Sequence, residues 1–453
     1  MNGLRVVLAA AALWLAALDD VNAQTVIRHT TQAGLTFRYV HIPQEQSQAL
    51  YFAWKDGSAV ALPGKEALPS LATALIMEGP RGSSRSAMIE DLRDLHATIA
   101  LSATVNVTQG HIVAPAEKFS ETARMLARTL ADPALPADAL ADMIKSRATS
   151  SRQTEANAET MAQRLLARLV IGRGPYRNYA VGEAASFERV TLADIERWRK
   201  NVLVRDGLVL VAAGPLPPSE LARDVDAVFA TLPLAGDLAP PAKPVLRAPG
   251  KLVVLERPVV QTAIAAGGPM QVHITPDFAR GQLAIVALGG ASSSRLWLAV
   301  REKLGATYGI SAAIQPVDFD NRTLLIRTAI ANDKAKDAVA AIREEYARLL
   351  ADGLRDEEIE PLKTIFIRNH RERMRRASNV AANLLVPAVR EFPDDFLATY
   401  EQRLRSYTRG AIEADMRAQF PEPPLTMVLV APSAEGLGAD CVIKSSVEIA
   451  RCD

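Results

Sequence analysis

Apolar residues recur along this chain with two different periods, which predict alternating strands and helices. In the first half, alternation at every second position and short apolar runs predict strands near 26–28, 36–41, 49–54, 98–105, 110–114 and 207–213. Apolar residues three and four apart predict helices near 65–78, 86–95, 115–130, 136–171 and 218–232. Thr191 and Asp194 form a capping box that starts one further helix.

The second half repeats this order of elements. Strands are predicted near 251–256, 261–266, 307–314, 323–328 and 425–430. Helices are predicted near 276–288, 294–303 and 332–349, and a long helical tract from 356 through the 370s is followed by more helix to about 405. Asn332 is predicted to cap one of these helices, and Thr408 another. Thr191 corresponds to Thr408 at an offset of 217 residues, and Leu210 corresponds to Leu429 at nearly the same offset. The sequence therefore predicts a duplicated domain.

The two copies are separated by a proline-rich stretch without periodicity at 233–248, which is typical of an extended linker. We expect an N-terminal domain at 24–232 and a C-terminal domain at 249–453. Hairpins mixed with helices predict an α+β fold with two homologous halves, each a mostly antiparallel sheet packed by helices.

Composition and charge exclude several classes of protein. The 453 residues include 52 basic and 51 acidic side chains, giving a formal net charge of +1. No basic block dominates any segment, so neither a nucleic-acid partner nor an anionic membrane surface is expected.

Residues 1–23 have the pattern of a secretory signal peptide: Arg5, an apolar run at 6–18, and small residues ending at Ala23. The apolar run is too short to cross a bilayer, which needs roughly 20 residues. A retained anchor is the alternative, and no later segment is predicted to span a membrane. The mature chain is expected to begin near Gln24 and to work in a bacterial periplasm.

The chain contains two cysteines, Cys441 and Cys452, both near its C-terminus. In an oxidising compartment we expect them to form a disulfide that closes a short loop. The alternative is two free thiols in a loose tail.

Residues 292–309 are the segment with the most specific pattern. Three serines at 292–294 are predicted to cap a helix, and Leu296, Val300 and Leu304 would form one apolar stripe on it. Gly305 is predicted to end the helix, and the alternation that begins at Tyr308 predicts a strand. Arg301 would then lie in the last helical turn, close to Tyr308 at one edge of a sheet.

This segment resembles the signature of the pitrilysin/insulinase-like zinc metallopeptidases, in which serine-arginine-leucine, arginine-glutamate-lysine, glycine and tyrosine follow in this order. The resemblance implies that Arg301 and Tyr308 hold the substrate backbone opposite a metal. The alternative is that Arg301 is a solvated charge at a helix end and Tyr308 a half-buried strand residue.

The resemblance also implies where zinc ligands should lie, because catalytic members carry H-x-x-E-H on the helix after the third strand. Two histidines four apart share one helical face and bind zinc, while the glutamate acts as general base. Aligned on Gly79, the metal positions correspond here to Ser70, Thr73 and Ala74, and the expected region of the third ligand, 145–152, contains no carboxylate. We therefore expect no metal and no catalytic residue on this chain.

No other metal site is predicted, because the histidines occur without a partner at helical ligand spacing. They are His29, His41, His96, His111, His273 and His370.

In two-subunit members of this family one subunit carries the zinc and the other carries the arginine-tyrosine pair. The resemblance therefore implies a non-catalytic, substrate-binding subunit of a heterodimeric periplasmic zinc peptidase. A homologous subunit with H-x-x-E-H would supply the zinc and the general base, and peptides would be the substrates. The rival interpretation is a degenerate peptide-binding or scaffold protein without a role in hydrolysis. A third, self-sufficient enzyme is disfavoured because the ligand positions are empty.

Overall fold

The computed structural model describes residues 25–55, 64–104, 107–172, 176–177, 184–237, 243–271 and 274–452. The expected signal peptide, residues 238–242 of the expected linker, and His273 lie outside the described residues.

The first half is built on a six-stranded sheet. The strands are β1 (Val26–Thr30), β2 (Thr36–His41), β3 (Ser47–Lys55), β4 (Thr98–Ala103), β5 (Val107–Pro115) and β6 (Leu208–Gly214). They lie in the order β1-β2-β6-β3-β5-β4, and β2 and β6 are parallel while the other neighbours are antiparallel.

The helices of the first half follow from its apolar spacing and its caps. They are α2 (Leu68–Ile76), α3 (Arg85–Asp94), α4 (Phe119–Ala131), α5 (Ala137–Ala156), α6 (Ala158–Val170), α8 (Ala184–Glu188), α9 (Leu192–Val202) and α10 (Pro218–Phe229), with a short 3₁₀ turn, η1 (Ala116–Lys118), before α4. The capping box of Thr191 and Asp194 is confirmed at the start of α9.

The prediction of one helical tract over 136–171 is wrong, because the tract breaks at Asn157. This residue has an extended backbone, and its side chain accepts a hydrogen bond from the Thr160 amide. Asn157 thus caps a new helix, α6, which leaves the direction of α5.

The second half has a second six-stranded sheet. Its strands are β7 (Leu252–Glu256), β8 (Gln261–Met270), β9 (Thr307–Pro316), β10 (Arg322–Ala331), β11 (Thr426–Ala431) and β12 (Cys441–Ile443), in the order β12-β7-β11-β8-β10-β9. Five strands repeat the arrangement of the first sheet, including the parallel pair, here β7 and β11. The sixth strand differs: β1 is the first strand of its sheet along the chain, whereas β12 is the last strand of the second sheet.

The helical elements of the second half are α11 (Ala279–Gly289), η2 (Trp297–Lys303), η3 (Asn332–Lys334), α12 (Ala335–Asp352), α13 (Asp356–Arg373), α14 (Ala377–Val389), α15 (Tyr400–Ser406), α16 (Arg409–Gln419) and η4 (Ser446–Arg451). The Thr408 cap of α16 is confirmed. The predicted Asn332 cap is wrong: its side chain instead bonds to Thr262 and to the carbonyls of Val259 and Val260, while α12 begins after Lys334.

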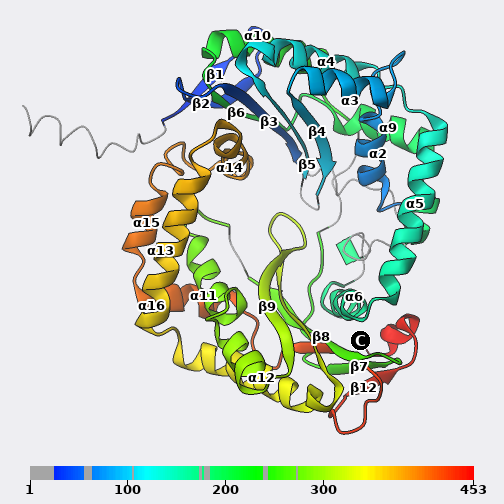
Figure 1. Ribbon diagram of the computed structural model, residues 1–453, viewed down its shortest axis with the longest axis vertical. Helices are drawn as coiled ribbons and strands as arrows, with labels where there is room; N and C mark the ends of the chain where they lie inside the picture. The colour runs from blue at the N-terminus through cyan, green and yellow to red at the C-terminus, as the bar shows by residue number, and fades with distance from the viewer. Residues whose placement is uncertain are drawn as a thin grey trace, which may run out of the picture.

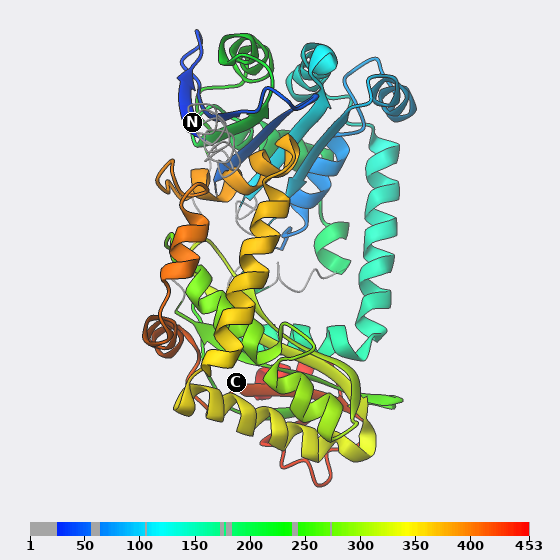
Figure 2. The same cartoon turned by 60° about the vertical axis from the view of Figure 1, so that its left-hand side comes forward.

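One helix of each half packs against the sheet of the other half. Leu165 and Leu169 of α6 pack with Val253 and Val428 of the second sheet. Reciprocally, α14 packs against β3 and β6 of the first sheet. Figures 1 and 2 show the two sheets at opposite ends of the molecule, with α5 and α13 running between them. The prediction of an α+β fold with two homologous halves is confirmed.

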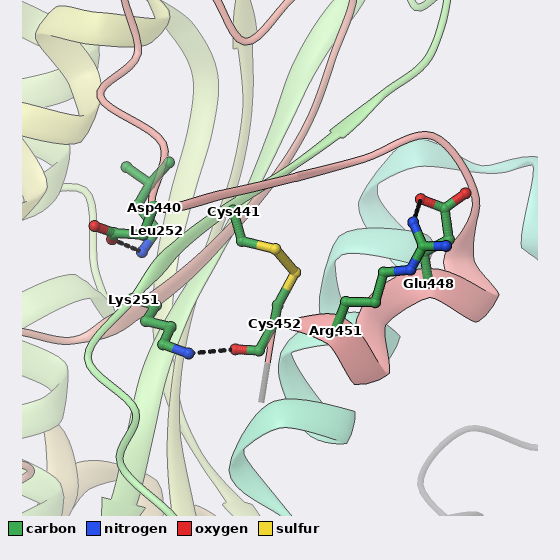
Figure 3. The surroundings of a disulfide bond; sticks show 7 residues. All are labelled: Lys251, Leu252, Asp440, Cys441, Glu448, Arg451 and Cys452. Atoms are coloured by element: carbon green, nitrogen blue, oxygen red, sulfur yellow. Dashed lines mark hydrogen bonds and ion pairs between the residues drawn. A yellow bond between two sulfur atoms is a disulfide. The ribbon is translucent and has the colours of Figure 1, made fainter.

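The C-terminal segment is fixed to strand β7 (Figure 3). Cys441 and Cys452 form a disulfide. The Lys251 ammonium donates to the carbonyl of Cys452 at 2.8 Å, and the Leu252 amide donates to Asp440 at 2.7 Å. These contacts hold β12 and η4 beside the sheet.

Among the described helices, we find none that combines the length and the apolar character required for crossing a bilayer.

Candidate functional site

Arg295, in the signature segment, has a structural role that the sequence did not reveal. Its side chain is 9% exposed, and its guanidinium donates to both carboxylate oxygens of Glu358, at 2.8 and 2.7 Å. It also donates to the Gly353 carbonyl at 2.7 Å. Burial alone would raise the pKa of Glu358, but hydrogen bonds from Arg295 and from Arg355 outweigh burial and lower this pKa to about 2. This bidentate pair fixes the start of the segment to the first turn of α13.

The predicted α-helix at 294–303 is instead π-helical over Trp297–Lys303 (η2). The wider turn places residues five apart over one another. The indole of Trp297 therefore donates to the Glu302 carboxylate at 3.2 Å. The predicted serine caps are wrong as well, because the helix start has no side-chain cap and the buried hydroxyl of Ser294 has no hydrogen-bond partner among the described residues.

Arg301 lies on the exposed side of this turn. Its guanidinium lies 4.5 Å from the centre of the Trp297 ring and donates to Glu302 at 2.8 Å. Its side chain is still 40% exposed. Stacking on an indole and one carboxylate contact orient the guanidinium while leaving most of its five N–H donors available.

Tyr308 lies near the start of β9, the edge strand of the second sheet, and is 90% exposed. Its neighbour Gly309 lies beside Trp297: a Cβ at Gly309 would be 4.0 Å from the indole. Arg301 and Tyr308 thus belong to adjacent elements that meet at Trp297. Within the described part of the chain, no hydrogen bond joins the two side chains directly.

The positions that correspond to the zinc site lie on α2. Thr73 is 3% exposed, and its hydroxyl donates back to the carbonyls of Pro69 and Ser70. The hydroxyl of Ser70 accepts a hydrogen bond from Arg147 of α5. Ala74 contributes no donor atom. In place of a metal, a guanidinium therefore connects the two helices on which ligands were expected.

The donor set does not fit a divalent cation. A positive guanidinium beside Ser70 repels a second cation, and neutral hydroxyls are poor zinc ligands. Within the described ranges, no three His, Cys, Asp or Glu side chains gather at metal-binding distances.

Three of the histidines that the structure describes contact aromatic rings or a backbone carbonyl. His111 stacks on Tyr51 with ring centres 4.9 Å apart, and His370 lies 4.5 Å from the Tyr400 ring. Burial lowers the pKa of both histidines, which favours their neutral forms. His41 is hydrogen-bonded to a backbone carbonyl.

A cavity of about 380 Å³ lies between the two halves, lined by parts of β5, α11, the β9–β10 hairpin and α14. Arg322 lines it and is 6% exposed; burial lowers its pKa to about 10. The guanidinium of Arg322 donates to the carbonyls of Asp318 and Asn321, which fixes the hairpin. This cavity could not be predicted from the sequence, because its lining comes from four separate segments.

Comparison with known proteins yields a consistent set of relatives. The family model described as "Peptidase M16 inactive domain" matches residues 189–366. An uncharacterized zinc protease of Rickettsia bellii is 21% identical over 335 residues, which cover 73% of this chain and 79% of that protein.

Two solved structures share the fold. The peptidase M16 inactive domain from Pseudomonas fluorescens superposes with a TM-score of 0.81 at 21% identity, covering 90% of this chain and 98% of that chain. The periplasmic protease PqqL from Escherichia coli gives a TM-score of 0.78 at 13% identity, covering 90% of this chain and 46% of the PqqL chain. The chain is therefore similar to the pitrilysin/insulinase-like (M16) peptidases, and it carries Ser70, Thr73 and Ala74 where the H-x-x-E-H motif of catalytic members would lie.

Proposed function

We propose that this chain is the non-catalytic, substrate-binding subunit of a heterodimeric periplasmic zinc metallopeptidase. The partner is a homologous subunit that carries H-x-x-E-H and supplies both the zinc and the general base. The observation that carries the proposal is a contrast between two sites: Arg147 occupies the degenerate metal site, whereas Arg301 and Tyr308 are accessible at 40% and 90% exposure.

The chemistry of the accessible pair supports this role. Arg301 is oriented by Trp297 and Glu302 and has donors left for the carbonyl of a bound peptide. The hydroxyl of Tyr308 can donate to an oxyanion that develops on that carbonyl, and the zinc of the partner would supply the activated water. An exposed tyrosine at a sheet edge buries little surface in the isolated chain and is free to contact another molecule.

The location is supported by two features. The disulfide between Cys441 and Cys452 fits an oxidising compartment. A structural relative, PqqL, is described as a periplasmic protease.

The test is co-expression with a zinc-bearing family member, followed by peptide hydrolysis assays. Tyr308→Phe removes one oxyanion donor and is expected to lower turnover about 100- to 1,000-fold. Arg301→Ala is expected to raise KM and lower turnover together. Arg343→Ala, an exposed arginine on α12, is the matched control and should leave hydrolysis unchanged.

Two outcomes contradict the proposal. If both variants hydrolyse peptides at the unmodified rate, Arg301 and Tyr308 are not part of the site, and a binding or scaffold protein is favoured. Stoichiometric zinc in the isolated chain, together with unaided peptide cleavage, would show a self-sufficient enzyme.

A further inference from the structure

A second cavity, of about 410 Å³, lies in the first half between α2, α3, β4 and α5. Its volume is within the range of small-ligand pockets, about 300–1,000 Å³. Its lining is mostly apolar and includes Met77, Met88, Ile89, Leu92, Leu101 and Met143.

Three charged side chains also line this cavity. Glu78 and Arg85 neutralise each other through an ion pair of 2.7 Å. The third, Arg147, is half-buried and donates to the neutral hydroxyl of Ser70. Among the described residues no carboxylate pairs with Arg147, so the described lining of the cavity leaves this positive charge uncompensated.

This environment favours a particular kind of ligand. Burial lowers the pKa of Arg147, because the guanidinium has lost water without gaining an anion. Arginine nevertheless stays protonated in proteins and binds carboxylates with two parallel N–H groups. A bound carboxylate would therefore replace the water that Arg147 has lost. An apolar group beside that carboxylate would bury its surface against the methionines that line the cavity.

We propose that this cavity binds the C-terminus of a peptide that ends in an apolar residue. The terminal carboxylate pairs with Arg147, and the terminal side chain enters the space between Met77, Met88 and Leu92. A C-terminal residue bears its carboxylate and its side chain on one carbon, which matches a cavity where a single cation adjoins an apolar wall. The site lies in the first half, whereas Arg301 and Tyr308 lie in the second, so it does not depend on the proposed shared active site.

The binding test uses the full mature chain alone and three hexapeptides labelled at the N-terminus, with affinity measured by fluorescence anisotropy. One peptide ends in leucine with a free carboxylate, the second is its C-terminal amide, and the third ends in serine with a free carboxylate. Amidation and the serine ending are each expected to weaken binding about tenfold or more.

Variants of Arg147 complete a thermodynamic cycle. Arg147→Met should weaken binding of the free-carboxylate peptide about tenfold or more and should no longer distinguish acid from amide. Arg147→Lys should keep part of the preference. Arg152→Met on the same helix, where Arg152 pairs with Glu188 at the surface, should bind like the unmodified protein.

The proposal is overturned if the unmodified protein binds acid and amide equally well. It is also overturned if Arg147→Met still prefers the acid. The comparison of acid with amide needs no variant, so it remains decisive even where Arg147→Met fails to fold. Neither result bears on hydrolysis with a zinc-bearing partner, so the two proposals can fail separately.

Discussion

Replacing Glu358 by glutamine tests whether the signature segment is held in place by a buried ion pair. In the unmodified protein, Glu358 accepts two hydrogen bonds from Arg295, whose side chain is 9% exposed. Glutamine keeps the shape and one acceptor but removes the charge. The variant therefore leaves a buried cation without its counter-ion, which is the costly way to break such a pair.

The expected loss of folding free energy follows from the pKa of Glu358. This pKa falls from 4.5 in the unfolded chain to about 2 in the folded protein. The difference of about 2.5, at about 1.4 kcal/mol for each pKa unit, corresponds to about 3 kcal/mol of folding free energy near neutral pH. Breaking one side of a buried pair costs a comparable 3–5 kcal/mol or so in other proteins.

The pH dependence has a definite sign. Because the folded pKa lies below the unfolded value, the contribution is fully present above pH 4.5 and is lost as the pH falls towards 2. The stability difference between Glu358→Gln and the unmodified protein should thus be largest at neutral pH and shrink steadily below pH 4.5.

Urea denaturation at pH 7, 4 and 3 measures this difference. The control is Glu372→Gln, because the pair of Glu372 with Arg375 is exposed and should contribute little. A difference below about 1 kcal/mol at pH 7, or one that stays constant with pH, would refute the view that the pair anchors the segment carrying Arg301.

Three further changes test the packing, each followed by its thermal midpoint of unfolding. Cys441→Ala/Cys452→Ala should lower the free energy of unfolding by only about 3 kcal/mol, because the disulfide closes a short loop. The midpoint of this variant should no longer respond to dithiothreitol. Leu384→Ala should cost about 2–5 kcal/mol and speed hydrogen exchange in β3 and β6 of the other half, whereas the exposed Val386→Ala should change neither. Gly267→Ala should cost about 1–3 kcal/mol or more, because its Cβ would lie 1.9 Å from the Leu324 carbonyl oxygen; Gly410→Ala, in open space on α16, should be neutral or slightly stabilising.

The sequence alone was sufficient to predict the element types and the duplication. Periods of two and about 3.6 are local properties, so strands such as β2 and helices such as α9 follow from their own residues and caps. The absence of the H-x-x-E-H motif is likewise a matter of residue identity. Ser70 and Ala74 cannot replace two histidines in any fold.

Contacts between distant segments had to come from the tertiary structure. An apolar face on α6 or α14 shows that the helix is buried but not which sheet it covers, and here each covers the sheet of the other half. The pair of Arg295 with Glu358 joins residues 63 positions apart. No periodic pattern in the sequence indicates such a contact.

The sequence determined what this chain lacks, and the tertiary structure decided what stands in its place. A metal motif is read from residue types at fixed helical spacing, whereas the placement of Arg147 against Ser70 depends on how α5 packs against α2. The same holds for the π-helical turn that sets Trp297 beside Arg301 and Glu302. Local propensities are fixed by neighbours in the chain, but side-chain partners are fixed by packing, and packing is a property of the whole fold.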